Sequence, residues 1–210
     1  MKDALQWLVP PVRKALTGRM RFLGLRRARV EDFWQFALGD LRMNNARGYL
    51  AEYLVGTALG IQELQRIEWD SYDLLFGAIT IEVKSSAYLQ LWDQKELSTL
   101  NFTGLQGIRS NPRAPDGGRD PLGRRLNAMV YVFGVQTSTS HDVYDQLNVA
   151  QWDFYVVSRS DLASTNQNSL GIARVKSLSG GATAWDDLKA AVTAAAVGQE
   201  RDDDGDWWGA

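Results

Sequence analysis

The apolar residues change their spacing at Gly60, and this change constrains the fold more than any other feature of the chain. Before Gly60, apolar residues recur at helical intervals, which predicts one helix over 31–41 and another over 46–59. We expect Asn44 or Asn45 to cap the second helix and Gly60 to end it, because these residue types favour those positions.

After Gly60 the chain consists of short segments rich in Ile, Leu, Tyr and Val, separated by Asp70-Ser71 and by Gly77. Such segments, bounded by turn residues, are typical of strands. We interpret them as three successive antiparallel strands over 61–69, 72–76 and 78–84.

The second half of the chain adds further elements of both kinds. Residues 103–125 contain many Gly and Pro residues and predict a long loop. The other expected elements are a partly helical stretch over 85–100, buried strands over 129–135 and 154–158, a sixth strand over 171–175, and a terminal helix over 186–197.

The order of elements predicts an α/β domain over residues 31–198, and charge marks the segments that flank it. Residues 1–30 form an expected basic helical arm, with seven basic residues and no acidic one between Ala4 and Val30. Residues 199–210 form an expected acidic, disordered tail. A basic arm is typical of proteins that bind nucleic acid, although a solvated helix face has the same composition.

Composition excludes several kinds of chemistry. The chain has no cysteine and a single histidine, His141, which excludes disulfides, thiolate metal sites and histidine-rich zinc sites. A metal here would be bound mainly by oxygen, which favours Mg²⁺ or Mn²⁺. The absence of cysteine and of any apolar run of about 20 residues leads us to expect a cytoplasmic protein without a membrane contact.

The strongest functional pattern is formed by Asp73, Glu82 and Lys84. Side chains alternate between the two faces of a strand, so Glu82 and Lys84 point the same way while Ile81 and Val83 point into the other layer. A turn at Gly77 brings Asp73 beside Glu82. Two carboxylates and a lysine then converge, a set suited to binding a hard cation and to stabilising charge on a phosphate.

The pattern resembles the signature of the PD-(D/E)XK nuclease superfamily, which contains the restriction-endonuclease-like enzymes. Asp73 followed by Glu82-Val83-Lys84 matches its D–X(n)–(D/E)–X–K form, with Tyr72 where proline would stand. Residues 47–55 resemble the family's first core helix, by which Glu52 is a further metal-site candidate. The resemblance covers roughly residues 44 to 136.

The resemblance implies a fold and an activity. The fold is an α/β, restriction-endonuclease-like αβββαβ core, with a mixed central sheet flanked by helices. The activity is Mg²⁺-dependent (or Mn²⁺-dependent) hydrolysis of DNA by a restriction-like endonuclease of a defence system or mobile element, with Asp73, Glu82 and Glu52 as metal ligands and Lys84 as a catalytic residue. A homodimer or a partner protein is compatible with this class.

Arginines provide the expected contacts to DNA, because phosphate contacts dominate non-specific affinity. The arginines in question lie in the basic arm and in the long loop, and they are Arg26, Arg27, Arg109, Arg113, Arg119, Arg124 and Arg125. The alternative interpretation is that they only form a solvated surface.

Each site residue also has a structural interpretation. Glu82 and Lys84 are compatible with an exposed ion pair, Asp73 with a turn, and Glu52 with a solvent-facing helix stripe. Asp70 is an alternative to Asp73. For the whole protein, the alternatives are a catalytically silent nuclease-fold subunit that binds nucleic acid or a partner protein, and an unrelated α/β protein in which the motif is a chance match.

Overall fold

The computed structural model describes residues 8, 14–62, 64, 71–109, 118 and 122–201. The chain divides into two compact units, Met1–Asp40 and Leu41–Ala210. The first unit contains α1, Val30–Leu38, which is the helix expected over 31–41. All other elements belong to the second unit.

The helix α2, Asn44–Leu59, ends at Gly60 as expected. Gly60 has a φ of 74°, in the left-handed region that glycine adopts without a steric cost, and its N–H bonds to the last turn of the helix. The expected asparagine cap is wrong, because Met43 occupies the N-cap position and both asparagines lie within the helix. Asn44 instead accepts a hydrogen bond from Arg47, at 2.5 Å.

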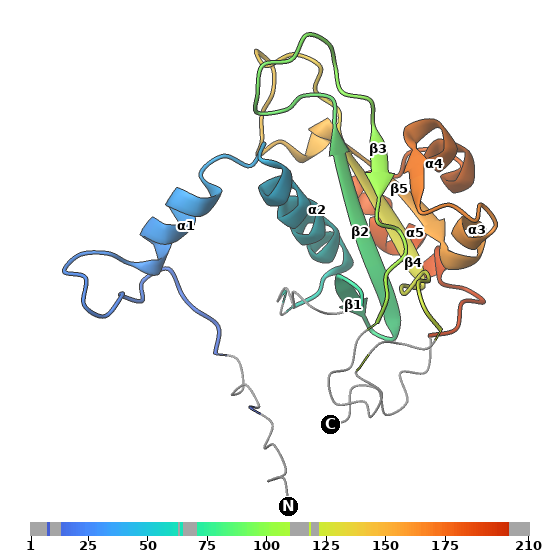
Figure 1. Cartoon of the computed structure of the whole chain (residues 1–210), viewed down its shortest axis with the longest axis horizontal. Coiled ribbons are helices and arrows are strands. Elements are labelled where there is room, and N and C mark those ends of the chain that lie inside the picture. Colours follow the sequence, from blue (N-terminus) through green and yellow to red (C-terminus); the bar gives the residue numbers. More distant parts are fainter. Residues whose placement is uncertain are drawn as a thin grey trace, which may run out of the picture. The chain divides into compact units, whose positions relative to one another are not determined.

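The second unit is built on a mixed four-stranded sheet (Figure 1). Its order is β1-β2-β4-β5, in which β2 and β4 are parallel and the two outer pairs are antiparallel. The strands span Leu74–Phe76, Ile79–Ala87, Val130–Gln136 and Trp152–Ser158. Four of the expected strands are therefore confirmed, with shifted ends.

One expected strand, over 61–69, does not form where the structure describes it. Ile61, Gln62 and Leu64 are not in a strand, and the remaining residues of that segment lie outside the described part of the chain.

The remaining elements pack against the sheet. These elements are β3 (Asn101–Thr103), η1 (Val149–Gln151), α3 (Arg159–Ala163), β6 (Ser169–Gly171), α4 (Ile172–Ser179), η2 (Trp185–Asp187) and α5 (Leu188–Ala195). Two short strands, β3 and β6, form a second antiparallel sheet, and α4 follows β6 directly.

Two expectations for these regions are wrong. The expected strand over 171–175 is mostly the helix α4, since only Gly171 pairs in β6. The expected helix within 85–100 is absent: the first three residues continue β2, and the rest is irregular. Side chains form hydrogen bonds there with backbone groups that a helix would use. The Gln90 backbone N–H donates to Gln94 Oε1 at 2.6 Å, and Gln94 Nε2 donates to the Tyr88 carbonyl at 3.2 Å.

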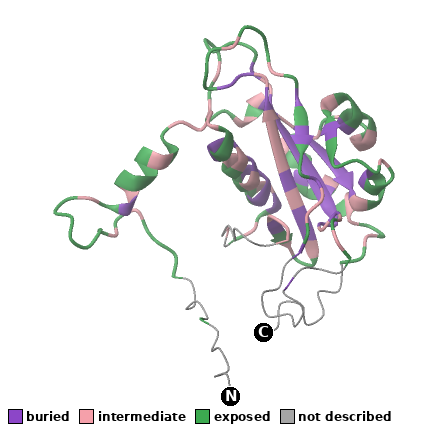
Figure 2. Ribbon diagram, viewed as in Figure 1, coloured by how far each residue is buried: buried purple, intermediate pink, exposed green. Residues whose placement is uncertain are grey.

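The sheet has an apolar layer on each face, as the buried strands in Figure 2 illustrate. Ile81 and Val83 belong to one core with α2 and α5, whereas Tyr131 and Phe133 belong to another with β3, β6, α3 and α4. The alternation along β2 therefore puts Glu82 on the second face, because its register partner on β4 is Tyr131.

The second unit is thus an α/β protein with a mixed sheet and flanking helices. Between β2 and β4, the described residues contain no helix of the kind expected for an αβββαβ core. Within the described part of the chain, no helix is long and apolar enough to cross a membrane.

Candidate functional site

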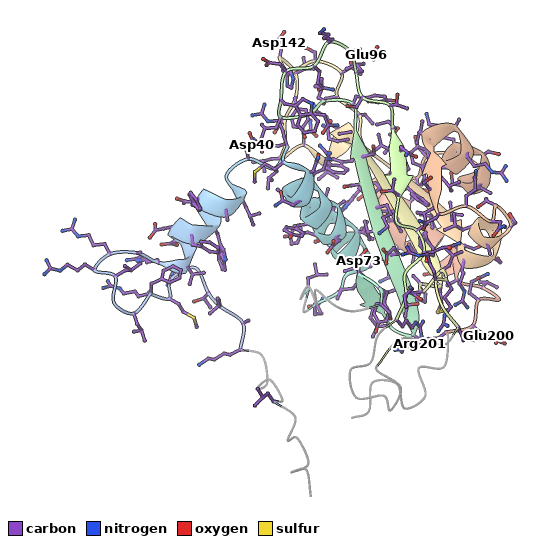
Figure 3. The ribbon with its side chains drawn as sticks, viewed as in Figure 1. Asp40, Asp73, Glu96, Asp142, Glu200 and Arg201 are labelled. Atoms are coloured by element: carbon purple, nitrogen blue, oxygen red, sulfur yellow. The ribbon has the colours of Figure 1, made fainter. Side chains whose placement is uncertain are left out.

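Asp73 stands immediately before β1, and its side chain is tied to β2 (Figure 3). Its Oδ2 accepts the Val83 N–H at 2.7 Å, and its own N–H donates to the Ile81 carbonyl at 3.0 Å. Extending the antiparallel register by one residue sets Asp73 opposite Glu82. Backbone groups of β2 therefore hold the Asp73 carboxylate in place, so its role is not limited to that of a turn residue.

Glu82 and Lys84 form an ion pair on the second face of β2. Lys84 Nζ donates to Glu82 Oε1 at 2.5 Å, and only 17% of the Glu82 side chain and 24% of the Lys84 side chain are exposed. The pair is therefore largely removed from water, unlike the exposed pairs that contribute little to stability. A half-buried charged pair on an apolar strand has a desolvation cost that its packing alone does not explain.

The electrostatics of the site centre on Glu82. The pKa of its carboxyl is raised to about 7, mainly by burial and then by the nearby Asp73 carboxylate, while Lys84 opposes the rise. When it is ionised, the Glu82 carboxylate lies in a poorly hydrated position beside the negative charge of Asp73. A cation bound there would offset the repulsion between the two carboxylates. The donor set, two carboxylates supplying hard oxygen atoms, fits Mg²⁺ or Mn²⁺.

Glu52 contributes to this group from α2, where it is half-buried. Its charge also raises the pKa of Glu82, although less than any other cause. Among the residues that the structure describes, no three His, Asp or Glu side chains converge closely enough to hold one ion. Asp73 and Glu82 are therefore the core of the candidate site, and Glu52 acts on it at longer range. Asp70 lies outside the described residues.

Tyr131 is a member of this site that the sequence analysis did not identify. It is the β4 partner of Glu82, it is 1% exposed, and its hydroxyl donates to the Leu105 carbonyl at 3.2 Å. Burial raises its pKa, the Glu82 charge raises it further, and Arg159 lowers it. Tyr131 lies in an apolar segment whose sequence predicts only a buried strand. No local pattern therefore marked it as a residue of the site.

The arginines predicted to bind nucleic acid fall into separate groups. Arg109 is 7% exposed and donates to both Asn127 Oδ1 and the Asn127 carbonyl at 3.3 Å, so it fastens the start of the long loop to its end. Arg124 is exposed and Arg125 is half-buried. Arg26 and Arg27 are exposed in the N-terminal unit, and Arg113 and Arg119 lie outside the described residues.

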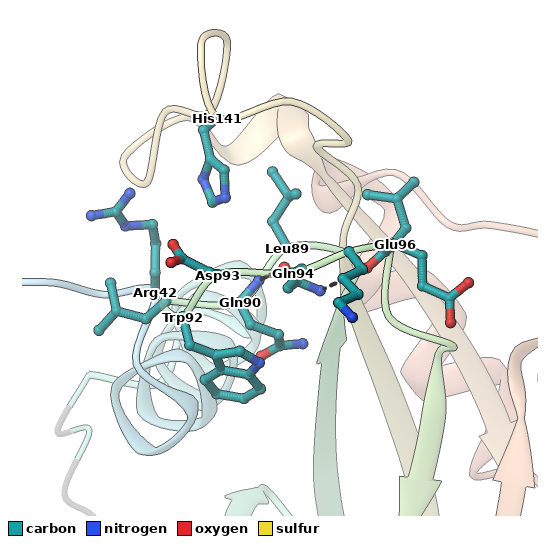
Figure 4. Close-up of a pocket in the computed structure, with 11 residues that line it drawn as sticks. Arg42, Leu89, Gln90, Trp92, Asp93, Gln94, Glu96 and His141 are labelled. Atoms are coloured by element: carbon teal, nitrogen blue, oxygen red, sulfur yellow. Dashed lines mark hydrogen bonds between the residues drawn. The ribbon is translucent and has the colours of Figure 1, made fainter.

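A separate hollow of about 620 Å³ lies beyond the end of β2 (Figure 4). It is formed by residues 89–97 together with Arg42 and His141, whose ring points into it. At about 3.3 Å per residue, Glu82 lies about 16 Å before the end of the strand at Ala87, so this hollow is not part of the carboxylate site. Gln90 and Gln94 shape this loop through their side-chain hydrogen bonds.

Comparison with known proteins gives no assignment, since no family model, no curated protein and no solved structure matches the chain.

Proposed function

We propose that this protein is a metal-dependent nuclease that hydrolyses phosphodiester bonds of DNA. The observation that carries the proposal is the desolvated group of Asp73, Glu82 and Lys84 on one face of the sheet. Its members match the D–X(n)–(D/E)–X–K signature in identity and spacing. A purely structural role does not explain why the first hairpin withdraws two carboxylates from water beside one lysine.

Each residue has a role in this proposal. Asp73 and Glu82 hold a divalent cation, Mg²⁺ or Mn²⁺, with Glu52 adding negative charge from α2. When bound, such a cation supplies Lewis acidity and lowers the pKa of a coordinated water. Lys84 orients the attacking water or offsets charge on the phosphoryl oxygen, and until substrate arrives it keeps Glu82 oriented through their ion pair.

The second candidate is a catalytically silent subunit that uses the same face to bind nucleic acid or a partner protein. The observation that favours it is the lack of a third converging carboxylate among the described residues. It predicts binding to DNA that does not depend on metal. A restriction-like role in a defence system or mobile element and a homodimer belong to the nuclease proposal and rest on the resemblance alone. A cytoplasmic location is a further part of the proposal, and it rests on composition.

A cleavage assay tests the proposal. Wild type, Glu82→Gln and Lys84→Ala are incubated with supercoiled plasmid or single-stranded DNA in Mg²⁺, Mn²⁺ or EDTA. Glu96→Gln, which changes an exposed carboxylate, is the matched control. We expect metal-dependent nicking by wild type and the control, and its loss by at least about 100-fold in the two site variants.

Folding of each variant is checked by circular dichroism. Cleavage that survives both substitutions would overturn the assignment of the site. Metal-independent DNA binding by wild type without any cleavage would favour the silent subunit.

A further inference from the structure

A second cavity, of about 700 Å³, opens where β5 passes into α3. We name it the arginine pocket. Four segments of the chain form it, and the residues used below are Gln106, Arg124, Arg125, Arg159 and Glu200. Figure 3 labels Glu200 at this end of the sheet.

Among the described residues that line the pocket, basic side chains outnumber acidic ones. Arg124, Arg125 and Arg159 contribute guanidinium groups, and Glu200 is the one acidic residue in this described lining. Guanidinium presents paired N–H donors that match the oxygens of a phosphate, and it stays charged at all physiological pH values. The chemistry of the lining therefore selects an anion, and a phosphate in particular.

Backbone bonds hold these arginines in position. Arg125 and Gly107 exchange backbone hydrogen bonds of 2.9 and 3.0 Å, which closes the base of the long loop. Arg124 Nη1 donates to the Gln106 carbonyl at 3.0 Å. The Arg159 N–H donates to the Met129 carbonyl at 2.9 Å, so this arginine begins α3 from a fixed point immediately before β4. A pocket built this way needs little ordering when an anion binds.

The arginine pocket adjoins the carboxylate site through Tyr131. Glu82 pairs with Tyr131 on β4, which pairs with Val157 on β5, two residues before Arg159. With strands about 4.8 Å apart and about 3.3 Å per residue, Glu82 and Arg159 are about 12 Å apart along the backbone surface. The electrostatic influence of both Glu82 and Arg159 on the Tyr131 hydroxyl agrees with this proximity.

We propose that the arginine pocket binds a phosphate group of the nucleic-acid strand whose scissile bond lies at Asp73 and Glu82. This inference rests on the proposed function and extends it. A separation of about 12 Å corresponds to a few nucleotides at about 3.4 Å of rise per strand residue. The pocket thus positions the strand while the carboxylate site acts on it, and Arg159 joins the residues that contact substrate.

The test measures binding in EDTA, where no cleavage takes place. Anisotropy of fluorescent 20-nucleotide DNA, single-stranded and duplex, with and without a 5′-phosphate, is recorded for wild type, Arg124→Gln and Arg159→Gln at several salt concentrations. Arg174→Gln is the matched control, because Arg174 is an exposed arginine on α4 outside the pocket.

We expect each pocket variant to weaken binding by about fivefold at moderate salt and to reduce the slope of log affinity against log salt by about one. The control should leave both values unchanged. A loss confined to 5′-phosphorylated DNA would identify a terminal phosphate, and an equal loss without it would identify an internal phosphate.

The two proposals fail separately in these experiments. If pocket variants and control bind alike, or if wild type does not bind DNA, the pocket inference is overturned. If the pocket variants weaken binding but cleavage does not depend on Glu82, the pocket inference stands and the nuclease assignment falls.

Discussion

Replacing Glu82 by glutamine tests the electrostatic picture of the site without any assumption about activity. Glutamine has nearly the shape of the protonated carboxyl but does not titrate. The pKa of Glu82 rises from an ordinary value near 4.5 to about 7 in the folded protein, mainly through burial and then through Asp73. Between these two pH values the folded protein binds a proton that the unfolded chain has already released, so the free energy of unfolding falls as pH increases.

The size of the effect follows from that interval. Each pH unit over which only the folded protein keeps the proton is worth about 1.4 kcal/mol. The interval from 4.5 to about 7 therefore corresponds to a loss of about 3 kcal/mol in wild type, complete above pH 7. The ion pair with Lys84 is already included, because it opposes the rise in the pKa. The Glu82→Gln variant does not lose this stability as pH rises, because glutamine does not titrate.

Urea denaturation at pH 5 and pH 8, in EDTA, measures the difference between the two proteins. Relative to wild type, Glu82→Gln should gain about 2.5 kcal/mol of stability on going from pH 5 to pH 8, because pH 5 already lies above the lower end of the interval. Glu96→Gln, at an exposed loop position, should keep the wild-type pH dependence. A stability difference between Glu82→Gln and wild type that stays constant within about 1 kcal/mol over this range would refute the reasoning.

Substitutions at two further positions test the local geometry of the fold. Asp73→Ala removes the acceptor of the Val83 N–H and should destabilise the fold by about 1–3 kcal/mol in urea denaturation, whereas Asp73→Asn keeps an acceptor there. Asp73→Asn should also lower the pKa of Glu82 measured by NMR titration, and an unchanged pKa would contradict their proximity. Gly60→Ala should cost about 1 kcal/mol because its φ of 74° is left-handed, although no atom obstructs a Cβ there. Gly60→Asn should cost less, and equal losses in thermal denaturation would argue against a conformational cause.

Elements with strong local signals were predicted well. The end of α2 at Gly60, the apolar strands β4 and β5, and the alternation of Glu82 and Lys84 on β2 all depend on neighbours within a few residues. Weaker signals failed where side chains compete for backbone groups, as Gln90 and Gln94 do after β2.

The sequence alone determined that Asp73, Glu82 and Lys84 lie together, because one short hairpin contains all three and strand periodicity sets their direction. Tertiary structure decided the rest of the surroundings. Tyr131 and Arg159 join this region only because β4 pairs with β2 and β5 pairs with β4, contacts between residues far apart in the chain. Desolvation of Glu82 likewise arises from layers packed over the sheet, so its raised pKa is a property of the fold that no local pattern encodes.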